Sequence, residues 1–184
     1  RDYTPRFFNP ETHELAIEFV LHGDGPAATW AAQAKPGQTL GIGGPKGSFV
    51  VSENYAHYLL IGDQTALPAI ARRLEEMPEG TNVTAMIEVA DAKEERPLAS
   101  NANASIVWLP RNGVEAGKST VLQEALTSYS LPSDDLHVWI GAEIETARQL
   151  RTLLIEEKGM TRDHIRAAGY WRLGATDGGG RVED

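Results

Sequence analysis

Short apolar segments that alternate with helical patterns constrain the fold of this chain more than any other feature. The segment 57–62 is almost continuously apolar, as expected of a strand that is buried on both faces of a sheet. Strands that alternate with helices indicate a mostly parallel sheet covered by helices on both faces. Hydrophobic spacing predicts further strands at 82–90, 105–109, 136–140 and 165–173, and helices at 66–77, 120–129 and 143–158.

The first 53 residues follow a different pattern. Residues 14–22 alternate between apolar and polar side chains, which predicts a half-buried strand. A Gly-Asp-Gly-Pro turn ends this strand, and the proline opens a short helix predicted over 27–34. The glycine-rich segment 38–51 predicts two short strands around a turn. The chain therefore divides into a mainly β region at 1–53, an α/β region at 54–174 and a tail at 175–184 that we expect to be flexible.

Charge and composition exclude several kinds of function. The 184 residues carry a formal net charge of −9, so the surface as a whole repels nucleic acid and anionic membranes. No apolar run approaches the roughly 20 residues that span a bilayer, and no signal peptide is visible, so we expect a cytoplasmic protein. The chain has no cysteine, so it forms no disulfide, no thiolate-bound iron–sulfur cluster and no cysteine-ligated zinc site. Redox chemistry would need an organic cofactor or a metal within the substrate.

Two motifs in the first region have the chemistry of a nucleotide site. On an extended segment Arg1 and Tyr3 share a face, so a guanidinium and an aromatic ring could meet one anionic aromatic ligand. In the segment HGDGPAATWA at 22–31, a strand runs into a helix whose free N–H groups and positive end can bind phosphate. Both motifs also have an ordinary structural interpretation, as a strand end and as a proline-opened helix with a tryptophan in the core.

Two more motifs follow predicted strands of the α/β region. Residues 62–66 join the first strand to its helix, and ligands of open α/β sheets gather outside the carboxyl ends of strands. Thr65 is suited to cap that helix, whose outer face is expected to carry Arg72 and Arg73. The segment 169–174, Gly-Tyr-Trp-Arg-Leu-Gly, puts two aromatic rings and a cation near the last strand, where they could bind an anion or belong to the core. The five histidines show no metal-ligand spacing, so no metal site is predicted.

Taken in order, the four motifs resemble the siderophore-interacting protein family, which consists of FAD-dependent ferric-siderophore reductases within the ferredoxin-reductase superfamily. The resemblance runs from Arg1 to Gly174. It implies that 1–53 is the C-terminal part of an antiparallel FAD-binding β-barrel and that 54–174 is a mostly parallel α/β domain like that of NAD(P)H reductases. The strands that normally precede the first motif in that barrel are absent from this sequence.

The resemblance also implies roles for individual residues. Arg1 would hold the FAD pyrophosphate, Tyr3 would lie against the isoalloxazine, and Thr4 would hydrogen-bond the flavin ring near N5, which makes Tyr3 and Thr4 the catalytic candidates. Lys46 and Arg172 are candidates for a basic pocket that receives an anionic ferric chelate. Gln64 stands where the family usually has an acidic residue. The predicted cofactor-binding set is completed by His22, Gly25, Pro26, Ala27, Asp63, Thr65, Ala66 and Trp171.

The implied activity is FAD-dependent reduction of iron(III)–siderophore complexes, which releases iron(II) because hard oxygen ligands bind it more weakly. The electron donor would be NADH, NADPH or a ferredoxin. Two alternatives stay open: a general NAD(P)H–flavin oxidoreductase, and a non-redox module that binds a siderophore or a nucleotide. A flavin absorbance spectrum would count against the non-redox module, and iron(II) release from a ferric siderophore would separate the two enzymes.

Overall fold

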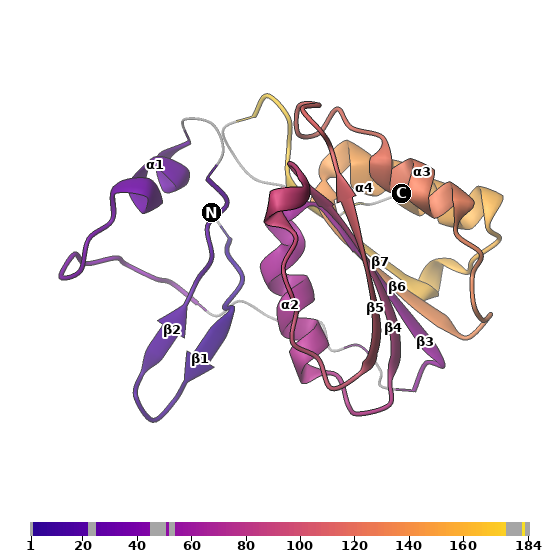
Figure 1. Ribbon diagram of the computed structural model, residues 1–184, viewed down its shortest axis with the longest axis horizontal. Helices are drawn as coiled ribbons and strands as arrows, with labels where there is room; N and C mark the ends of the chain where they lie inside the picture. Colours follow the sequence, from indigo (N-terminus) through magenta and orange to yellow (C-terminus); the bar gives the residue numbers. More distant parts are fainter. Residues whose placement is uncertain (1, 22–24, 45–50, 52–53, 176–181, 183–184) are drawn as a thin grey trace.

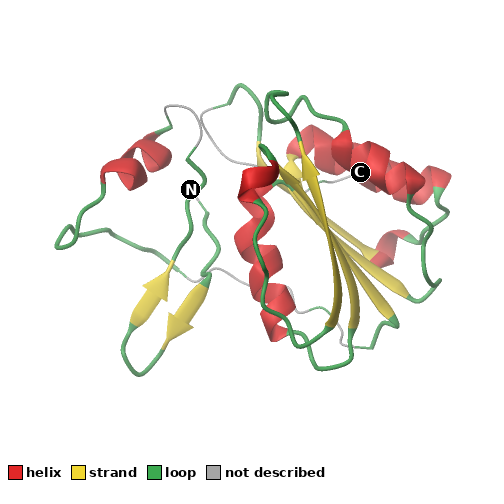
Figure 2. Ribbon diagram, viewed as in Figure 1, coloured by secondary structure: helices red, strands yellow, loops and turns green. Residues whose placement is uncertain are grey.

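A computed structural model describes residues 2–21, 25–44, 51, 54–175 and 182. Two parts are visible in Figure 1 and, coloured by secondary structure, in Figure 2. Residues 2–21 and 25–44, here called the arm, contain β1 (Phe7–Asn9), β2 (Glu14–Ala16) and α1 (Pro26–Gln33). Residues 54–175, here called the α/β unit, hold the larger sheet. The arm lies beside α2 of the α/β unit, so the two parts face each other across this helix.

The α/β unit is built on a five-stranded sheet in which every neighbouring pair is parallel. Its strand order is β5-β4-β3-β6-β7, so the chain moves outward from β3 in one direction and then returns to the other side of β3. The loops after β3 and β6 therefore lie at the point where strand order reverses, the usual ligand position in such sheets. The strands are β3 (His57–Gly62), β4 (Asn82–Val89), β5 (Asn103–Pro110), β6 (Leu136–Glu143) and β7 (Ile165–Trp171).

Helices cover both faces of this sheet, as the sequence predicts. Leu59 and Ile61 of β3 pack toward α3 and α4, whereas Tyr58 and Leu60 pack toward α2. Because both faces are covered, the strand can be apolar at every position. The helices are α2 (Leu67–Glu76), α3 (Val121–Ser128) and α4 (Ile144–Thr152), which continues as a π-helical turn over Leu153–Glu157, with short 3₁₀ turns at Gln64–Ala66, Ala92–Glu94 and Arg162–His164.

The arm departs from its predicted secondary structure. The strand predicted over 14–22 forms a ladder only at Glu14–Ala16, and residues 17–21 continue without strand pairing. The two strands predicted over 38–51 are not formed in residues 38–44. The reason is that β1 and β2 pair only with each other, over three residue pairs, so the described arm offers no further strand for a ladder. Residues 45–50 and 52–53, and most of the predicted tail, lie outside the described residues.

No helix within the described ranges has both the length and the apolar character needed to cross a membrane.

Candidate cofactor site

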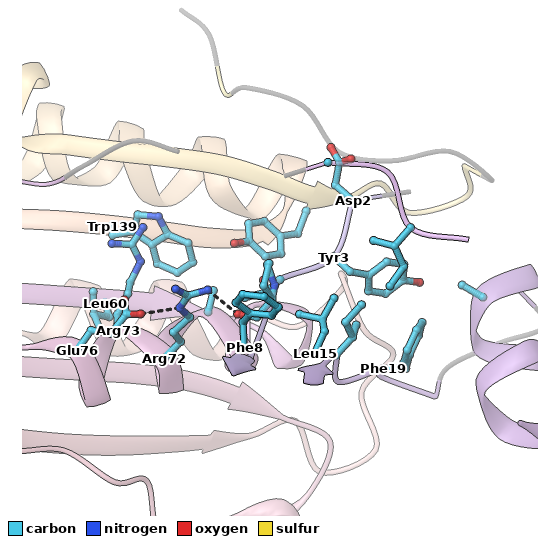
Figure 3. Close-up of a pocket in the computed structure, with 18 of the residues that line it drawn as sticks. Asp2, Tyr3, Phe8, Leu15, Phe19, Leu60, Arg72, Arg73, Glu76 and Trp139 are labelled. Atoms are coloured by element: carbon cyan, nitrogen blue, oxygen red, sulfur yellow. Dashed lines mark hydrogen bonds and ion pairs between the residues drawn. The ribbon is translucent and has the colours of Figure 1, made fainter. Parts of the chain in front are cut away.

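A cleft of about 1550 Å³ separates the arm from the face of the sheet that carries α2 (Figure 3). This volume exceeds the roughly 300–1,000 Å³ of most small-ligand pockets, so the cleft is large enough for a dinucleotide. The arm contributes Tyr3, Phe8, Phe19 and Trp30 to its lining, and the α/β unit contributes Leu60, Arg72, Arg73, Trp139 and Tyr170.

Aromatic rings of the arm form a continuous wall of this cleft. The ring centroids of Tyr3 and Phe19 are 4.7 Å apart, and those of Phe19 and Trp30 are 5.9 Å apart. Tyr3 is 39% exposed, so one side of its ring is available to a ligand. Trp30 is half-buried in this wall rather than in a core. The predicted residues Tyr3, Thr4, Pro26 and Ala27 all line the same cleft.

The beginning of α1 is suited to an anion. Gly25 is the N-cap residue, and it has no side chain to satisfy the N–H groups of the first turn. Pro26 lacks an N–H, and the first turn contains no acidic residue. The positive end of the helix dipole is therefore left uncompensated by its own side chains, at the edge of the cleft where Pro26 and Ala27 lie.

Asp63 organises the carboxyl edge of the sheet. Its Oδ1 accepts from the Thr65 backbone N–H at 2.8 Å and from the Thr65 hydroxyl at 2.5 Å. Its Oδ2 accepts from the Glu143 backbone N–H at 2.9 Å and from Trp171 Nε1 at 2.8 Å. Four donors thus occupy a carboxylate that has about four acceptor positions. Asp63 ties the ends of β3, β6 and β7 together and orients Trp171.

Ala66 packs beneath the same loop and has no exposed surface. A Cβ added to Gly62 would lie 2.7 Å from Ala66 Cβ and 2.8 Å from the Gly141 carbonyl oxygen. The loop after β3 therefore approaches β6 as closely as glycine allows. Ala66 can therefore affect a cofactor site only indirectly, by holding the residues that pack against it in place.

A second cavity, of about 40 Å³, lies at this edge between the arm and the α/β unit. Asp63, Thr65 and Trp171 line it together with Val20 of the arm. The predicted site residues that line a cavity therefore form two groups, one from the arm in the large cleft and one from the α/β unit in the small cavity. Gly25, Ala66 and Arg172 are in neither lining. Arg172 follows β7 and is exposed. Arg1, His22 and Lys46 lie outside the described residues.

A buried charged network beside the small cavity is absent from the sequence predictions. Glu88 Oε1 lies 3.1 Å from Arg111 Nε, and both side chains are nearly buried. Burial, reinforced by the charge of Asp63, raises the pKa of Glu88 to about 7, although Arg111 and a Ser119 hydrogen bond oppose this. Glu88 is the second-last residue of β4 and Arg111 follows β5, so only the sheet brings the two side chains together.

The same network explains the amide at position 64. Arg111 Nη2 donates to Gln64 Oε1 at 2.6 Å, and the Gln64 amide nitrogen donates to Glu94. An acidic side chain could accept from Arg111 but would face the Glu94 carboxylate with like charge. Glutamine satisfies both neighbours because it carries a donor and an acceptor.

Two arginines of α2, expected on its outer face, instead line the large cleft. Arg72 Nη1 donates to the Pro5 carbonyl oxygen at 2.7 Å, and its Nε pairs with Glu76 at 2.7 Å. The Arg73 guanidinium lies 4.8 Å from the centre of the Trp139 ring, and burial lowers the pKa of Arg73. The α/β side of the cleft thus carries two arginines, and Glu76 of α2 and Asp2 of the arm line the same cleft. Helical spacing could not reveal this because the arm covers the face that the sequence assigns to solvent.

His137 of β6 also borders the cleft and is buried. Neither of its ring nitrogens has a hydrogen-bond partner among the described residues. Burial, together with the charges of Arg73 and His164, lowers the pKa of His137 to about 4. The ring is therefore neutral near pH 7 and lies 5.1 Å, centroid to centroid, from Tyr55.

Comparison with protein families gives two matches that together span both parts of the chain. Residues 1–49 match the siderophore-interacting FAD-binding domain, and residues 55–174 match the siderophore-interacting protein family. The second match alone covers more than half of the chain. The chain belongs to the siderophore-interacting protein family.

Individual relatives agree with this assignment. An NADPH-dependent ferric-chelate reductase of Escherichia coli K12 is 36% identical over 174 residues, which are 93% of this chain and 65% of that protein. The ferric vibriobactin reductase ViuB of Vibrio cholerae is 32% identical over 180 residues, covering 96% of this chain and 66% of that protein. A siderophore utilization protein from T. fusca has a crystal structure that superposes with a TM-score of 0.88 at 44% identity, covering 95% of this chain and 67% of that one. The chain thus spans slightly less than two thirds of the two reductases.

Proposed function

We propose that this chain carries the flavin site of an FAD-dependent ferric-siderophore reductase that uses NADPH as electron donor. The observation that carries the proposal is the cleft, in which Tyr3, Thr4 and the start of α1 face an aromatic surface of the α/β unit that also carries Arg72 and Arg73. The names of the two curated relatives support the reaction, since one is a ferric-chelate reductase that depends on NADPH and the other reduces ferric vibriobactin.

The residues of the cleft fit FAD. Tyr3 offers an exposed ring face backed by Phe19, and the start of α1 leaves backbone donors for a pyrophosphate. When bound, FAD would supply the step between a two-electron donor and one-electron acceptors. On this proposal, Tyr3 holds the ring system by stacking, Thr4 donates or accepts a hydrogen bond at its edge, and Gly25, Pro26 and Ala27 hold the phosphates. Arg1 and His22 stay predicted ligands of the same cofactor.

The remaining assignments follow from the same arrangement. Residues 1–53 would be the C-terminal part of an antiparallel FAD-binding barrel, a proposal that the antiparallel pair β1–β2 supports. Residues 54–174 would be the NAD(P)H-reductase-like domain. Asp63 and Ala66 are buried and would act indirectly, by fixing the conformation of the loop that carries Thr65. Trp171 would close the site. Lys46 and the exposed Arg172 would attract an anionic ferric chelate, and the use of NADPH favours a cytoplasmic reaction.

The overall reaction balances as one NADPH and two iron(III) chelates giving NADP⁺, one proton and two iron(II) ions, which the siderophore then releases. The test uses the full-length protein. We expect flavin absorbance bands after addition of FAD, bleaching by NADPH without oxygen, and two iron(II) per NADPH when iron(III) tris-catecholate is added with an iron(II)-specific chelator. Absence of flavin binding would overturn the proposal. Iron(II) formation no faster than with free reduced flavin would favour the general flavin reductase, and reduction only by added ferredoxin would replace the donor.

A further inference from the structure

The arm meets the α/β unit directly after Tyr3. Thr4 lines the same cleft as Tyr170 of β7, and its side chain opposes the rise in the Tyr170 pKa that burial causes. The Pro5 carbonyl oxygen accepts a hydrogen bond from Arg72 Nη1 at 2.7 Å, drawn as a dashed line in Figure 3. The Arg6 guanidinium donates to both carboxylate oxygens of Glu75, at 2.7 Å and 2.5 Å. The segment on which the two catalytic candidates lie is therefore held by hydrogen bonds at Pro5 and Arg6.

The contact between Arg6 and Glu75 is the stronger of the two by geometry. Two parallel N–H···O bonds between a guanidinium and a carboxylate fix direction as well as distance. The Arg6 side chain is only 20% exposed, and its Nε also lies 3.2 Å from Glu18, which extends the contact to the part of the arm that follows β2. The hydrogen bond with Glu75 raises the pKa of Arg6 and lowers that of Glu75, so both groups stay charged near pH 7.

The position of this anchor in the sequence matters for Tyr3. Along an extended segment each residue advances the chain by about 3.3 Å, and successive side chains point to opposite sides. A shift of one residue would therefore turn the Tyr3 ring away from the cleft. The hydrogen bonds at Pro5 and Arg6 prevent such a shift because each has its own partner on α2.

Tyr170 lines the same cleft as Thr4. Burial raises the pKa of Tyr170, so its hydroxyl stays neutral and keeps its hydrogen. The Tyr170 hydroxyl can therefore donate a hydrogen bond to an acceptor in this cleft. Tyr170 also meets Trp139 edge to face, with ring centroids 5.9 Å apart, which restricts its side chain.

We propose that Arg6, Arg72, Glu75 and Tyr170 form a latch that fixes Tyr3 and Thr4 relative to the α/β unit. They are positioning residues for the flavin site: Arg6, Arg72 and Glu75 hold the segment that carries Tyr3 and Thr4, and Tyr170 lines the cleft together with Thr4. This inference rests on the proposed function, because it concerns the cofactor that Tyr3 and Thr4 are proposed to contact. It assigns a task to the tyrosine of the 169–174 segment, which the family resemblance leaves without one.

The first experiment is a double-mutant cycle on the full-length protein with Arg6→Gln, Glu75→Gln and the double variant. We expect each single variant to weaken FAD binding about tenfold, because a small displacement of a positioned group has effects of this size or larger. The double variant should be no worse than Arg6→Gln alone, since both changes break one contact. The readouts are the FAD dissociation constant, from quenching of flavin fluorescence, and the melting temperature of the apoprotein.

The matched control is the exposed pair Arg148–Glu145 on α4, which is also a guanidinium–carboxylate contact at 2.5 Å. Arg148→Gln and Glu145→Gln should leave the FAD dissociation constant unchanged. Additive losses in the Arg6 and Glu75 cycle, or equal losses in the control pair, would overturn the latch.

The second experiment separates Tyr170 from a merely structural role. Tyr170→Phe removes one hydroxyl group and should shift the flavin absorbance maximum and lower kcat about twofold to tenfold, the range of one hydrogen bond, with KM for NADPH unchanged. The control is Tyr129→Phe, because the Tyr129 hydroxyl bonds Thr84 Oγ1 at 3.1 Å within the α/β unit and does not line the cleft. It should leave the flavin spectrum as it was.

Different results would refute the proposed function and the latch. If the unaltered protein binds no FAD, the proposed function is wrong. If it binds FAD and reduces the chelate, but Arg6→Gln, Glu75→Gln and Tyr170→Phe behave like the unaltered protein, the latch is wrong and the function stands.

Discussion

The arm and the α/β unit contain similar apolar residues but bury them very differently. Among the described residues, nine large apolar side chains are exposed, and seven of these lie in the arm. The largest fully buried side chains all lie between Leu59 and Leu154, within the α/β unit. An alternating or apolar pattern therefore produces a core only where other elements cover both faces of the strand that carries it. The arm is placed by a few polar anchors instead.

The largest effect is expected when one leucine side chain is truncated in each region. Leu150→Ala on α4 empties a fully buried position between the helix and the sheet, and we expect a loss of about 2–5 kcal/mol in the free energy of unfolding. Leu40→Ala in the arm changes a side chain that is 46% exposed and should cost less than about 1 kcal/mol. Urea unfolding followed by circular dichroism measures both. Equal losses would mean that the arm has a core of its own.

The pH dependence of stability provides the next test. The folded-state pKa of His137 is lowered to about 4. The stability that the neutral His137 ring contributes is therefore fully present above pH 6.5 and is lost as pH falls from 6.5 to 4. The pKa of Glu88 is raised to about 7, so the folded state holds more protons between pH 4.5 and 7, and stability falls as pH rises through that range. Each effect amounts to at most about 3 kcal/mol, and the two oppose each other.

Single variants should reveal the two opposing effects. His137→Phe should leave a protein whose stability declines from pH 4.5 to 7, and Glu88→Gln should leave one whose stability rises from pH 4 to 6.5. Chemical denaturation at a series of pH values measures the slopes. Identical pH profiles for the two variants would contradict the assignment of these groups.

These groups also mark the limit of what the sequence could predict. The strands and helices of the α/β unit were predictable to within a few residues, because their periodicity reflects burial on both faces. Glu88 and Arg111, or Arg6 and Glu75, meet only because of strand order and the docking of the arm. No spacing rule relates residues so far apart in the chain. The resemblance to a family identified motif positions such as Asp63, but it could not reveal that four internal donors occupy that carboxylate.

A smaller effect is expected from adding a single methyl group to a glycine of each region. A Cβ on Gly62 would lie within 2.8 Å of a backbone oxygen of β6, so Gly62→Ala should cost about 1–3 kcal/mol by overpacking. Gly41 of the arm has nothing within 4 Å of the same position and has no left-handed backbone, so Gly41→Ala should be close to neutral. Thermal unfolding compares the two. A larger loss at position 41 would show that the arm is packed more tightly than its exposure indicates.

The smallest effect is expected when salt weakens the exposed ion pairs that link the arm to the α/β unit. Glu18 of the arm pairs with Arg96 at 3.2 Å, and both side chains are nearly half exposed, so salt screens this contact and its contribution is at most about 1 kcal/mol. Raising sodium chloride from about 0.05 to 0.5 M should therefore speed hydrogen exchange in the arm a fewfold while leaving β3 and β6 unchanged. Arg96→Gln should reproduce the change at low salt and remove most of its salt dependence. The buried strands cannot respond in this way, because their stability comes from apolar packing that screening does not weaken. An equal response in both regions would mean that they open as one unit, and the arm would then owe its position to more than its polar anchors.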